Sequence, residues 1–561
     1  MPYDNPTFAR PAWPDLSLVF APDRVLFRGQ GGSVTGHGFL YAAHALAARL
    51  PDRPVVIMCR EVRAFTLLFA ATLLRGQHAI LSSDRTSAHL GALAARHGAI
   101  CATMADDPEH GHLPEDGLVF PDPFHGPDPF HGAYRPGMAL APNPVLPPDR
   151  LAALVFTSGS TGEPVGHVKH WGALVARSVV ACGLLDPDRE AASLIGTVPP
   201  YHMYGFETLV LQTLHTRVTA ITGPDRYPAD WQGQFEQASV PRILITTPLQ
   251  LRSLARAGLA MPPIRRVVSA AAPLPDALAA EAERALQTEV MEIYGATETG
   301  SVATRRTLDG PCWHLYDGIV LDVANGHATI AAPGAAPHPL SDLVAREGAR
   351  GFRLLGRVGD VVKLAGKRTS LAALNATLLA LDGVEDGAFL APDEAAAAAW
   401  ARMRAFAVAP GRDPDDLLNA LRARIEPAFL PRRIHLVPAM PRNAVGKLTV
   451  QALRGLADRT DGTEELGTFS LPPDHPALPG HFPGQPVVPG VLLVLGGLAC
   501  LERAGLSVPG LSVSTVKFVR PVLPGQVVAF SARRAGDTVR LTGRNEGKPV
   551  LQAILRQRSG S

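Results

Sequence analysis

The sequence predicts an α/β protein made of several domains. Its 561 residues exceed the roughly 250–300 residues at which a single hydrophobic core usually stops growing. An apolar run at 55–59, a helical pattern at 63–74 and a second apolar run at 78–81 are typical of parallel strands joined by a helix. A charged stretch at 458–465 indicates a linker before a separate C-terminal segment.

Charge and cysteine content exclude several classes of function. The formal net charge is +2, so we expect no nucleic-acid partner and no general attraction to an anionic membrane. The five cysteines are widely spaced, which argues against a zinc site or a disulfide framework and for a reducing, cytoplasmic location. The polar, proline-containing start of the chain predicts no signal peptide. The apolar runs at 65–74 and 491–500 are shorter than the roughly 20 residues that span a bilayer, so we expect no membrane span.

A tandem repeat lies between residues 109 and 132. Both copies read Pro-Asp-Pro-Phe-His-Gly, and the segment is rich in Pro, Gly and His. The histidines His110, His112, His125 and His131 allow a metal-binding tract, whereas the density of Pro and Gly favours an exposed irregular loop. We expect the irregular loop.

A loop of small residues follows the next apolar strand, 151–156, and is a candidate phosphate site. It contains Thr157, Ser158, Gly159, Ser160, Thr161 and Gly162. Glycines let the backbone approach a ligand closely, and successive backbone N–H groups together with hydroxyl donors suit phosphate oxygens. The loop is not of the Gly-x-x-x-x-Gly-Lys type, because no Lys follows in that register. The alternative is a flexible Ser/Gly connector.

An aromatic and histidine cluster lies on a turn at 198–205, bounded by proline and glycine. It includes Tyr201, His202 and Gly205. From composition alone, this cluster is either the lining of an acyl pocket or an ordinary part of the core.

A carboxylate lies just beyond a predicted strand at 290–293. The strand runs into Tyr294, Gly295, Thr297 and Glu298. Open α/β sheets bind ligands at the carboxyl ends of their parallel strands. A carboxylate beside a phosphate site can hold Mg²⁺, which prefers oxygen ligands. Glu298 is therefore the candidate metal ligand.

The loop at 157–166 and the run at 294–298 resemble motifs of the adenylate-forming ligases. This family includes acyl- and aryl-CoA synthetases, luciferases and the adenylation domains of peptide synthetases. The resemblance implies that the loop binds the phosphates of ATP. It also implies that Thr297 contacts the α-phosphate, that Glu298 holds Mg²⁺ and that Tyr294 stacks on adenine.

The loop departs from the family's pattern at one position. The family usually has Lys where this chain has Val165. His167 or Lys169, just downstream, can supply part of the positive charge near the phosphates.

Other positions match the family's nucleotide site. By resemblance, Ala271, Ala272 and Pro273 form the opposite wall of the adenine slot. Asp342 and Arg357 are, by the same resemblance, the residues that meet the ribose.

The family's mobile lysine also has a counterpart. The run at 441–447 matches its Pro-Arg-x-x-x-Gly-Lys motif. By resemblance, Lys447 binds the carboxylate and the α-phosphate during adenylation, and Gly359 lies at the hinge between a large and a small domain. The turn at 198–205 is similar to a family turn that implies a place for His202 beside the substrate carboxylate.

A second resemblance covers the C-terminal segment. Residues 481–492 match the His-Phe-Pro-Gly-x-Pro-x-x-Pro-Gly-Val-Leu motif of the hotdog-fold 3-hydroxyacyl-carrier-protein dehydratases. This implies an antiparallel sheet wrapped round one long helix, a homodimer, and His481 as the catalytic base. The dehydratases usually place an acid fourteen positions after the histidine, where this chain has Leu495. We therefore expect weak or no dehydratase activity.

The two resemblances together predict four parts. A large adenylate-forming α/β domain occupies 1–356 and a small α+β lid domain occupies 357–457. The linker at 458–465 then leads to an α+β hotdog domain at 466–561.

The predicted activity is the ATP- and Mg²⁺-dependent ligation of a small carboxylic acid to a phosphopantetheine thiol through an acyl-adenylate. We expect the thiol of an acyl carrier protein rather than that of coenzyme A. The fusion resembles those encoded for bacterial aryl-polyene pigments of the xanthomonadin type, in which a hydroxybenzoate-like acid is loaded. The alternatives are a medium- or long-chain fatty-acyl-CoA synthetase and a non-catalytic acyl-carrier-binding protein.

Overall fold

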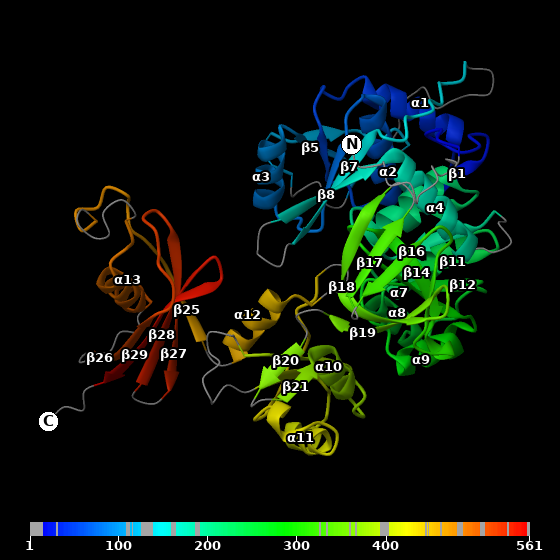
Figure 1. Ribbon diagram of the computed structural model, residues 1–561. Helices are drawn as coiled ribbons and strands as arrows, with labels where there is room; N and C mark the ends of the chain where they lie inside the picture. The colour runs from blue at the N-terminus through cyan, green and yellow to red at the C-terminus, as the bar shows by residue number, and fades with distance from the viewer. Residues whose placement is uncertain are drawn as a thin grey trace. The chain divides into compact units, whose positions relative to one another are not determined.

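The computed structural model describes most of the chain (Figure 1). The described residues are 15–29, 32–107, 113–114, 116–124, 139–158, 164–185, 191–324, 327–332, 335–357, 361–364, 367–392, 403–443, 446, 448–460, 463–478, 486–504, 511–535 and 538–557. The chain forms two compact units, one of Met1–Gly359 with Ala444–Lys447 and one of Asp360–Asn443 with Leu448–Ser561. We describe each unit by itself.

The first unit contains a six-stranded sheet in the order β6-β5-β3-β4-β7-β8. Its strands are β3 (Val55–Ile57), β4 (Ala79–Ser82), β5 (Ile100–Met104), β6 (Leu118–Phe120), β7 (Leu151–Ser158) and β8 (Pro164–His170). All neighbouring pairs are parallel except β7 and β8, which pair antiparallel. Helices α1 (Gly36–Ala47), α2 (Val62–Leu74) and α3 (Ser87–His97) accompany this sheet. The strand–helix–strand pattern expected at 55–81 is confirmed.

Helix α2 is buried along nearly its whole length because it packs between α1 and the sheet. Its N-terminus is capped by the Glu61 side chain, which accepts a hydrogen bond of 2.7 Å from the backbone N–H of Ala64. On the same helix, the buried Arg63 donates to Asp122 at 2.8 Å, so its charge is paired. Alternate strand residues face opposite sides, with Val55 in the core under α2 and Val56 in the core under α3.

A thirteen-stranded sheet forms the rest of the first unit as described. Its order is β16-β17-β18-β19-β15-β14-β13-β12-β11-β9-β10-β1-β2. The strands are β1 (Val25–Gly29), β2 (Gly32–Thr35), β9 (Ser193–Gly196), β10 (Thr219–Ile221), β11 (Arg242–Thr246), β12 (Arg266–Ser269), β13 (Val290–Ala296), β14 (Gly300–Arg306), β15 (Trp313–Leu315), β16 (Val320–Ala324), β17 (His327–Ala332), β18 (Ala335–Glu347) and β19 (Gly351–Arg357). The run from β1 through β10, β9, β11 and β12 to β13 is parallel, and β13 onward is antiparallel.

Helices cover both faces of the parallel part of this sheet. They are α4 (Trp171–Leu185), α5 (Met203–Gly205), the π-helical segment η2 (Phe206–Leu211), α6 (Gln212–His215), α7 (Pro228–Gln237), α8 (Pro248–Arg256) and α9 (Asp276–Leu286), with a 3₁₀ turn η3 (Thr307–Asp309). Leu244 of β11 packs with α7, α8 and α9, whereas its neighbours Ile243 and Ile245 pack with η2 on the other face. The predicted α/β class is thus confirmed.

The second unit begins with small elements around their own core. They are the hairpin β20 (Val361–Leu364) and β21 (Lys367–Ser370), the sheet of β22 (Asp386–Leu390), β23 (Arg404–Val408) and β24 (Ile434–Leu436), and α10 (Leu371–Leu379), α11 (Pro414–Arg422), η5 (Pro427–Phe429) and α12 (Val450–Thr460). Asp413 caps α11, its side chain accepting a bond of 2.7 Å from the backbone N–H of Asp415. This mixture of helices and a small sheet agrees with the predicted α+β class.

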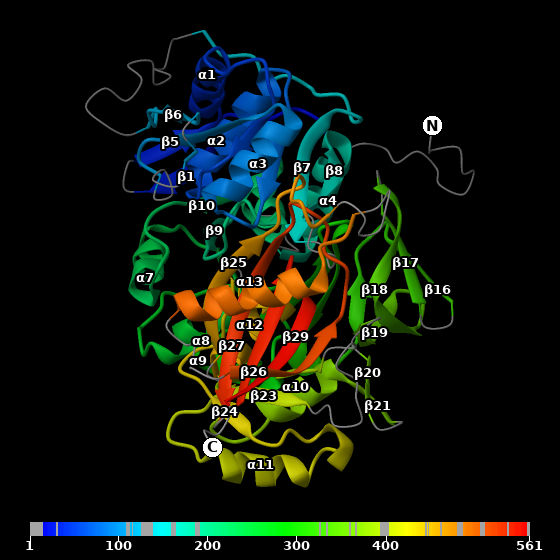
Figure 2. The ribbon, with the colours of Figure 1, turned by 90° about the vertical axis from the view of Figure 1, so that its left-hand side faces the viewer.

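A five-stranded antiparallel sheet ends the chain, in the order β25-β27-β28-β29-β26. Its elements are β25 (Thr463–Ser470), α13 (Gly490–Arg503), β26 (Leu511–Phe518), β27 (Val527–Ala535), β28 (Thr538–Asn545) and β29 (Lys548–Gln557). Figure 2 shows α13 lying across one face of this sheet. Glycines permit this close packing, because a Cβ atom at Gly496 would lie 2.5 Å from the Phe469 ring and one at Gly497 would lie 2.7 Å from Leu541. The expected hotdog arrangement is confirmed.

No helix among the described residues is long and apolar enough to cross a membrane. The boundary between the two units at residue 359 lies close to the predicted end of the large domain at 356. The division of the second unit into a lid, a linker and a hotdog domain remains a prediction.

A buried histidine in the first unit makes folding sensitive to pH. His215 lies at the end of α6, where its Nδ1 is 2.9 Å from the Ser178 hydroxyl and its ring meets the Trp171 ring edge-on at 4.8 Å. Burial, together with the positive charge of Arg24, lowers the pKa of His215 to about 3. The unfolded chain therefore binds a proton below about pH 6.5 that the folded chain does not.

We predict that His215→Gln flattens the acid side of the stability profile. Because the folded-state pKa is depressed, the contribution of His215 is fully present above about pH 6.5 and is lost as the pH falls. Between pH 7 and pH 5 the wild type should lose about 2 kcal/mol more than the variant in the free energy of unfolding. Urea unfolding followed by tryptophan fluorescence measures this. The exposed His314 provides the matched control, His314→Gln, and equal slopes for wild type and His215→Gln would contradict the prediction.

Candidate active site

Two loops at the carboxyl ends of β12 and β13 form one side of the candidate site. Ala271, which follows β12, has a φ of +73°, a left-handed conformation that costs a non-glycine residue about 1–3 kcal/mol. Backbone strain of this kind concentrates at binding sites. Ala271 and Ala272 are half-buried and Pro273 is exposed. The strained turn therefore lies where the second wall of the adenine slot was expected.

Tyr294 joins two residues that were expected to bind the nucleotide. Its hydroxyl donates a hydrogen bond of 2.7 Å to Oδ2 of Asp342 on β18. Its ring packs against Trp313 and Phe352, with centroids 5.5 and 5.6 Å away. Strand pairing sets Asp342 directly opposite Arg357 on β19. The structure thus brings the expected adenine residue and the two expected ribose residues together, although the Arg357 side chain lies outside the described atoms.

The tight turn between β13 and β14 presents Glu298. A Cβ atom at Gly295 would lie 2.4 Å from the backbone oxygen of Gly300, so only glycine allows the hairpin to close here. Gly300 itself has a φ of +72°, which favours glycine. Thr297 and Glu298 are half-buried on this turn, and the Glu298 side chain is 28 % exposed.

Strand β8 of the other sheet approaches this turn. Nζ of Lys169 donates a hydrogen bond of 3.0 Å to the backbone oxygen of Glu298, and Nε2 of His167 lies 3.6 Å from Oε1 of the same residue. Burial lowers the pKa of Lys169 to about 8, against the opposing effects of Glu207 and Glu298. Burial also lowers the pKa of His167, and Glu298 opposes that shift. Positive charge therefore does reach the Glu298 turn.

Sequence reasoning missed Glu207, which lies in the π-helical segment η2 and is 2 % exposed. It accepts a hydrogen bond of 3.0 Å from the backbone N–H of Ser301 and a second, short bond from the Ser301 hydroxyl. Lys169 and Arg177, both buried, interact electrostatically with it. A single carboxylate within the apolar run Phe206–Leu211 is the signal that identifies it.

The turn at 198–205 is tied firmly to the core. Nδ1 of His202 caps α5 by accepting a bond of 3.3 Å from the backbone N–H of Tyr204, whose hydroxyl donates to the Val268 carbonyl at 2.8 Å. Arg85 stacks over the buried Tyr201 ring at 4.2 Å. A Cβ atom at Gly205 would lie 2.2 Å from the Pro199 oxygen, so glycine is required there. The place of His202 beside a substrate carboxylate remains a prediction.

Several expected site residues lie outside the described part of the chain. These are Gly159, Ser160, Thr161, Gly162, Gly359, Lys447, His481 and the histidines of the tandem repeat, His110, His112, His125 and His131. For Thr157 and Ser158 the structure describes the backbone, which ends β7 opposite Val165 and Pro164 of β8. The loop at 159–163 therefore connects the antiparallel strands β7 and β8, whose backbone is described as far as Ser158 and from Pro164.

The described residues fit a magnesium ion that is held mainly by the phosphates of ATP. Within them, no cluster of three or more His, Cys, Asp or Glu side chains could form a metal cage. Mg²⁺ usually binds one or two carboxylates together with phosphates and water. The partly exposed carboxylate of Glu298 suits that arrangement.

Comparison with protein-family models matches residues 20–328, more than half of the chain, to the AMP-binding enzymes. The chain belongs to this family. Residues 458–548 match the model described as ApeI dehydratase.

The AMP-binding relatives agree with that assignment. A 4-coumarate–CoA ligase from Rhodobacter capsulatus is 29% identical over 303 residues, which cover 53% of this chain and 74% of that protein. The fatty acid–[acyl-carrier-protein] ligase ScoC from Streptomyces coeruleorubidus is 27% identical over 361 residues, which cover 55% and 67%. ATP-bound MatB from Rhodopseudomonas palustris has the same fold, with a TM-score of 0.65 at 19% identity over 78% of this chain and 96% of that one.

Membership of this family defines the reaction class. The protein is an ATP-dependent, AMP-forming acid–thiol ligase. It uses ATP and Mg²⁺, and its acyl acceptor is a phosphopantetheine thiol. The alternative of a non-catalytic acyl-carrier-binding protein is thereby set aside.

We predict that Tyr294→Phe weakens nucleotide binding without affecting acid binding. The change removes the hydroxyl that orients the Asp342 carboxylate toward its expected ribose partner. Loss of a hydrogen bond to a charged group should raise the KM for ATP by about tenfold, with the KM for the acid unchanged. Steady-state kinetics measure both. The exposed Tyr227 supplies the control, Tyr227→Phe, and an unchanged KM for ATP in Tyr294→Phe would count against this role.

Proposed function

We propose that this ligase activates a small aryl acid, of the hydroxybenzoate type, and loads it onto an acyl carrier protein as the starter unit of an aryl polyene. The observation that carries the proposal is the presence in one chain of an AMP-binding ligase and a segment that matches the ApeI dehydratase model. A dehydratase-like unit handles acyl chains on carrier proteins, so its fusion to a ligase favours a carrier protein over coenzyme A. The similarity to ScoC supports the same acceptor.

An aryl substrate is supported by the turn at 198–205 and by the relatives. The matched proteins include ligases named for 4-coumarate, an aromatic acid. In the proposal, His202 lies beside the carboxylate, and Tyr201 and Tyr204 narrow the slot to a flat ring. Both tyrosines are held rigidly, one beneath Arg85 and one against the Val268 carbonyl, which suits a slot of fixed shape.

The chemistry divides among a few residues of this chain. Carboxylate attack on the α-phosphate brings anions together, and positioned cations offset the charge that develops. We assign that role to Lys447, with Thr297 as the donor to the α-phosphate and Glu298 as the metal ligand. Bound Mg²⁺ polarises the phosphates as a Lewis acid. A hinge at Gly359 would then carry the second domain from adenylation to thioester formation.

The function is tested by ATP–pyrophosphate exchange across aryl and fatty acids. Hydroxybenzoates should support exchange and dodecanoate should support far less.

Lys447→Ala should lower exchange by about a hundredfold or more, because the charge of the transition state loses its counter-ion. Transfer from a supplied aryl-adenylate should change much less. A preference for dodecanoate or longer acids would favour the fatty-acyl-CoA synthetase, and full exchange in Lys447→Ala would remove Lys447 from the mechanism.

The hotdog segment is proposed to hold an acyl or pantetheine chain, or to form the homodimer, rather than to dehydrate. Leu495, at the usual position of the acid, is 53% exposed on α13. The acid of this helix, Glu502, lies about 10 Å further along. A homodimer is supported by exposed apolar side chains on the edge strand β26, Val513 and Phe518.

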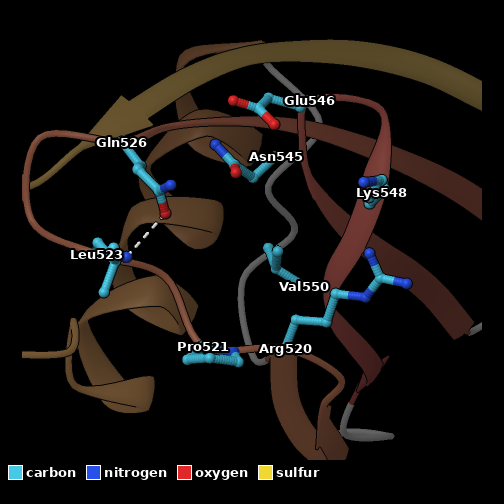
Figure 3. Close-up of a pocket in the computed structure, with 8 residues that line it drawn as sticks. All are labelled: Arg520, Pro521, Leu523, Gln526, Asn545, Glu546, Lys548 and Val550. Atoms are coloured by element: carbon cyan, nitrogen blue, oxygen red, sulfur yellow. Dashed lines mark hydrogen bonds between the residues drawn. The ribbon is translucent and has the colours of Figure 1, made fainter. Parts of the chain in front are cut away.

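A cavity on this segment supports the binding of a phosphorylated chain. It has a volume of about 240 Å³ and lies between the turn before β27 and the turn joining β28 to β29. Figure 3 shows Arg520 and Lys548 along its β29 side, while Gln526 on the opposite side accepts a bond from the Leu523 backbone N–H. Two cationic side chains at one cavity, whose lining also includes the Glu546 carboxylate, suit the phosphate of phosphopantetheine.

We predict that the full-length protein has weak or no dehydratase turnover. A 3-hydroxyacyl carrier protein should remain unchanged, because a base without a positioned acid cannot expel the hydroxyl. His481→Ala should make no difference. Turnover like that of a working dehydratase, lost in His481→Ala, would contradict this.

Sedimentation of the same samples should show a dimer, and a monomer at micromolar concentration would contradict the dimeric role.

A further inference from the structure

Three residues on strand β8 share one face of the strand. Side chains alternate along a strand, so Val165, His167 and Lys169 project to the same side. Val165 is the position at which the ligase family usually has Lys, and it is exposed, whereas Lys169 is 8 % exposed. This face of β8 thus lacks the family's usual lysine at Val165 but carries a different lysine, Lys169, four residues further along.

That second cation holds the main chain of the proposed metal ligand. Nζ of Lys169 donates to the Glu298 carbonyl at 3.0 Å, and Nε2 of His167 lies 3.6 Å from the Glu298 carboxylate. Two side chains from one strand therefore contact the backbone and the side chain of the same residue. Val165 is paired with Thr157 at the far end of β8, away from this contact.

The position of Lys169 is fixed by charge as well as by this hydrogen bond. Lysine is almost never buried without a partner. The buried Glu207 attracts the ammonium, and Glu207 is itself fixed by two hydrogen bonds from Ser301, which follows the turn. Arg177 also lies beside Gly300, because a Cβ atom there would stand 3.4 Å from Oε2 of Glu207 and 3.6 Å from Nε of Arg177. The turn is thus held by Lys169 from β8 and by Glu207 from η2.

We propose that Lys169 is a positioning residue for adenylation, which fixes the Glu298 turn through the Glu298 carbonyl so that the carboxylate meets the metal of MgATP. This rests on the proposed role of Glu298 as metal ligand. Lys169 acts on the backbone of the turn rather than by contacting a phosphate. It compensates in part for the missing lysine at Val165 by a different route, because a rigid carboxylate binds the metal without further ordering.

Metal binding tests this apart from turnover. Mn²⁺ replaces Mg²⁺, and the electron paramagnetic resonance signal of free Mn²⁺ reports its binding to the full-length protein with a non-hydrolysable ATP analogue. Lys169→Met should weaken Mn²⁺ binding by about tenfold and raise the Mg²⁺ needed for half-maximal exchange by a similar factor. The KM for the acid should not change. Lys517→Met, an exposed lysine on β26, is the matched control and should behave as wild type.

A second pair of variants separates positioning from charge. Lys169→Gln keeps a polar side chain facing Glu207, but this side chain is too short to reach the Glu298 carbonyl. It should therefore show the same loss of Mn²⁺ binding as Lys169→Met. It also provides the test if Lys169→Met folds poorly. Adding Val165→Lys to Lys169→Met restores a cation on the same face of β8, and it should not restore Mn²⁺ binding. Recovery to within about twofold of wild type would show that charge alone matters and would overturn the proposal.

Wild-type Mn²⁺ affinity in both Lys169 variants would also overturn it. In that case, ATP–pyrophosphate exchange by the wild type would still support the proposed function. Absence of exchange in the wild type with every acid would instead speak against the proposed function.

Discussion

A buried positive charge that must be neutralised is the constraint on which the candidate active site depends. Lys169 is nearly inaccessible to water, and breaking a buried pair by removing one partner typically costs about 3–5 kcal/mol. The charge of Lys169 is offset by the carboxylate of Glu207 from η2 and by a hydrogen bond to the carbonyl of Glu298 from the β13–β14 turn. Because each partner comes from a different element, satisfying one charge fixes three elements at once.

The backbone around this charge is shaped to allow the contact. Glu207 lies in a π-helical segment, and such segments are frequent at functional sites because they shift side chains relative to a regular helix. Gly295 lets the hairpin close to a distance that any side chain would prevent, and Gly300 has a φ of +72°, which favours glycine. Ala271 on the neighbouring loop holds a left-handed conformation without the freedom of glycine. The rim of the site is therefore built from backbone conformations that the surrounding core must enforce.

The two segments of the chain that match known families use different ways of packing a helix. In the ligase unit, α2 is enclosed by apolar side chains along nearly all its length, and its one buried charge, Arg63, is paired with Asp122. In the C-terminal sheet, α13 approaches closely because Gly496 and Gly497 leave room for Phe469 and Leu541. The same helix leaves Val491 and Leu495 exposed on its outer side. One face of α13 therefore packs on the sheet, and its other face carries apolar side chains that are exposed among the described residues.

The sequence by itself determined the class of the fold, its local elements and the family. The strand–helix–strand unit near residue 60 and the apolar helix near residue 495 follow from periodicity, which encodes burial along a single element. Motifs of consecutive residues predicted a phosphate loop and the run that ends in Glu298. These features are local, so neighbouring residues suffice to define them.

Only the tertiary structure decided which of these residues meet. Lys169 and Glu298 are 129 residues apart, Glu207 and Ser301 are 94 apart, and Tyr294 and Asp342 are 48 apart. The pairing of Asp342 with Arg357 depends on strand register, which a shift of one residue would destroy. Composition favoured neither reading of the turn at His202, and the structure ties that turn to the core through Tyr204 and Gly205. Contacts across sheets depend on the packing of the whole unit, and no local pattern in the chain records them.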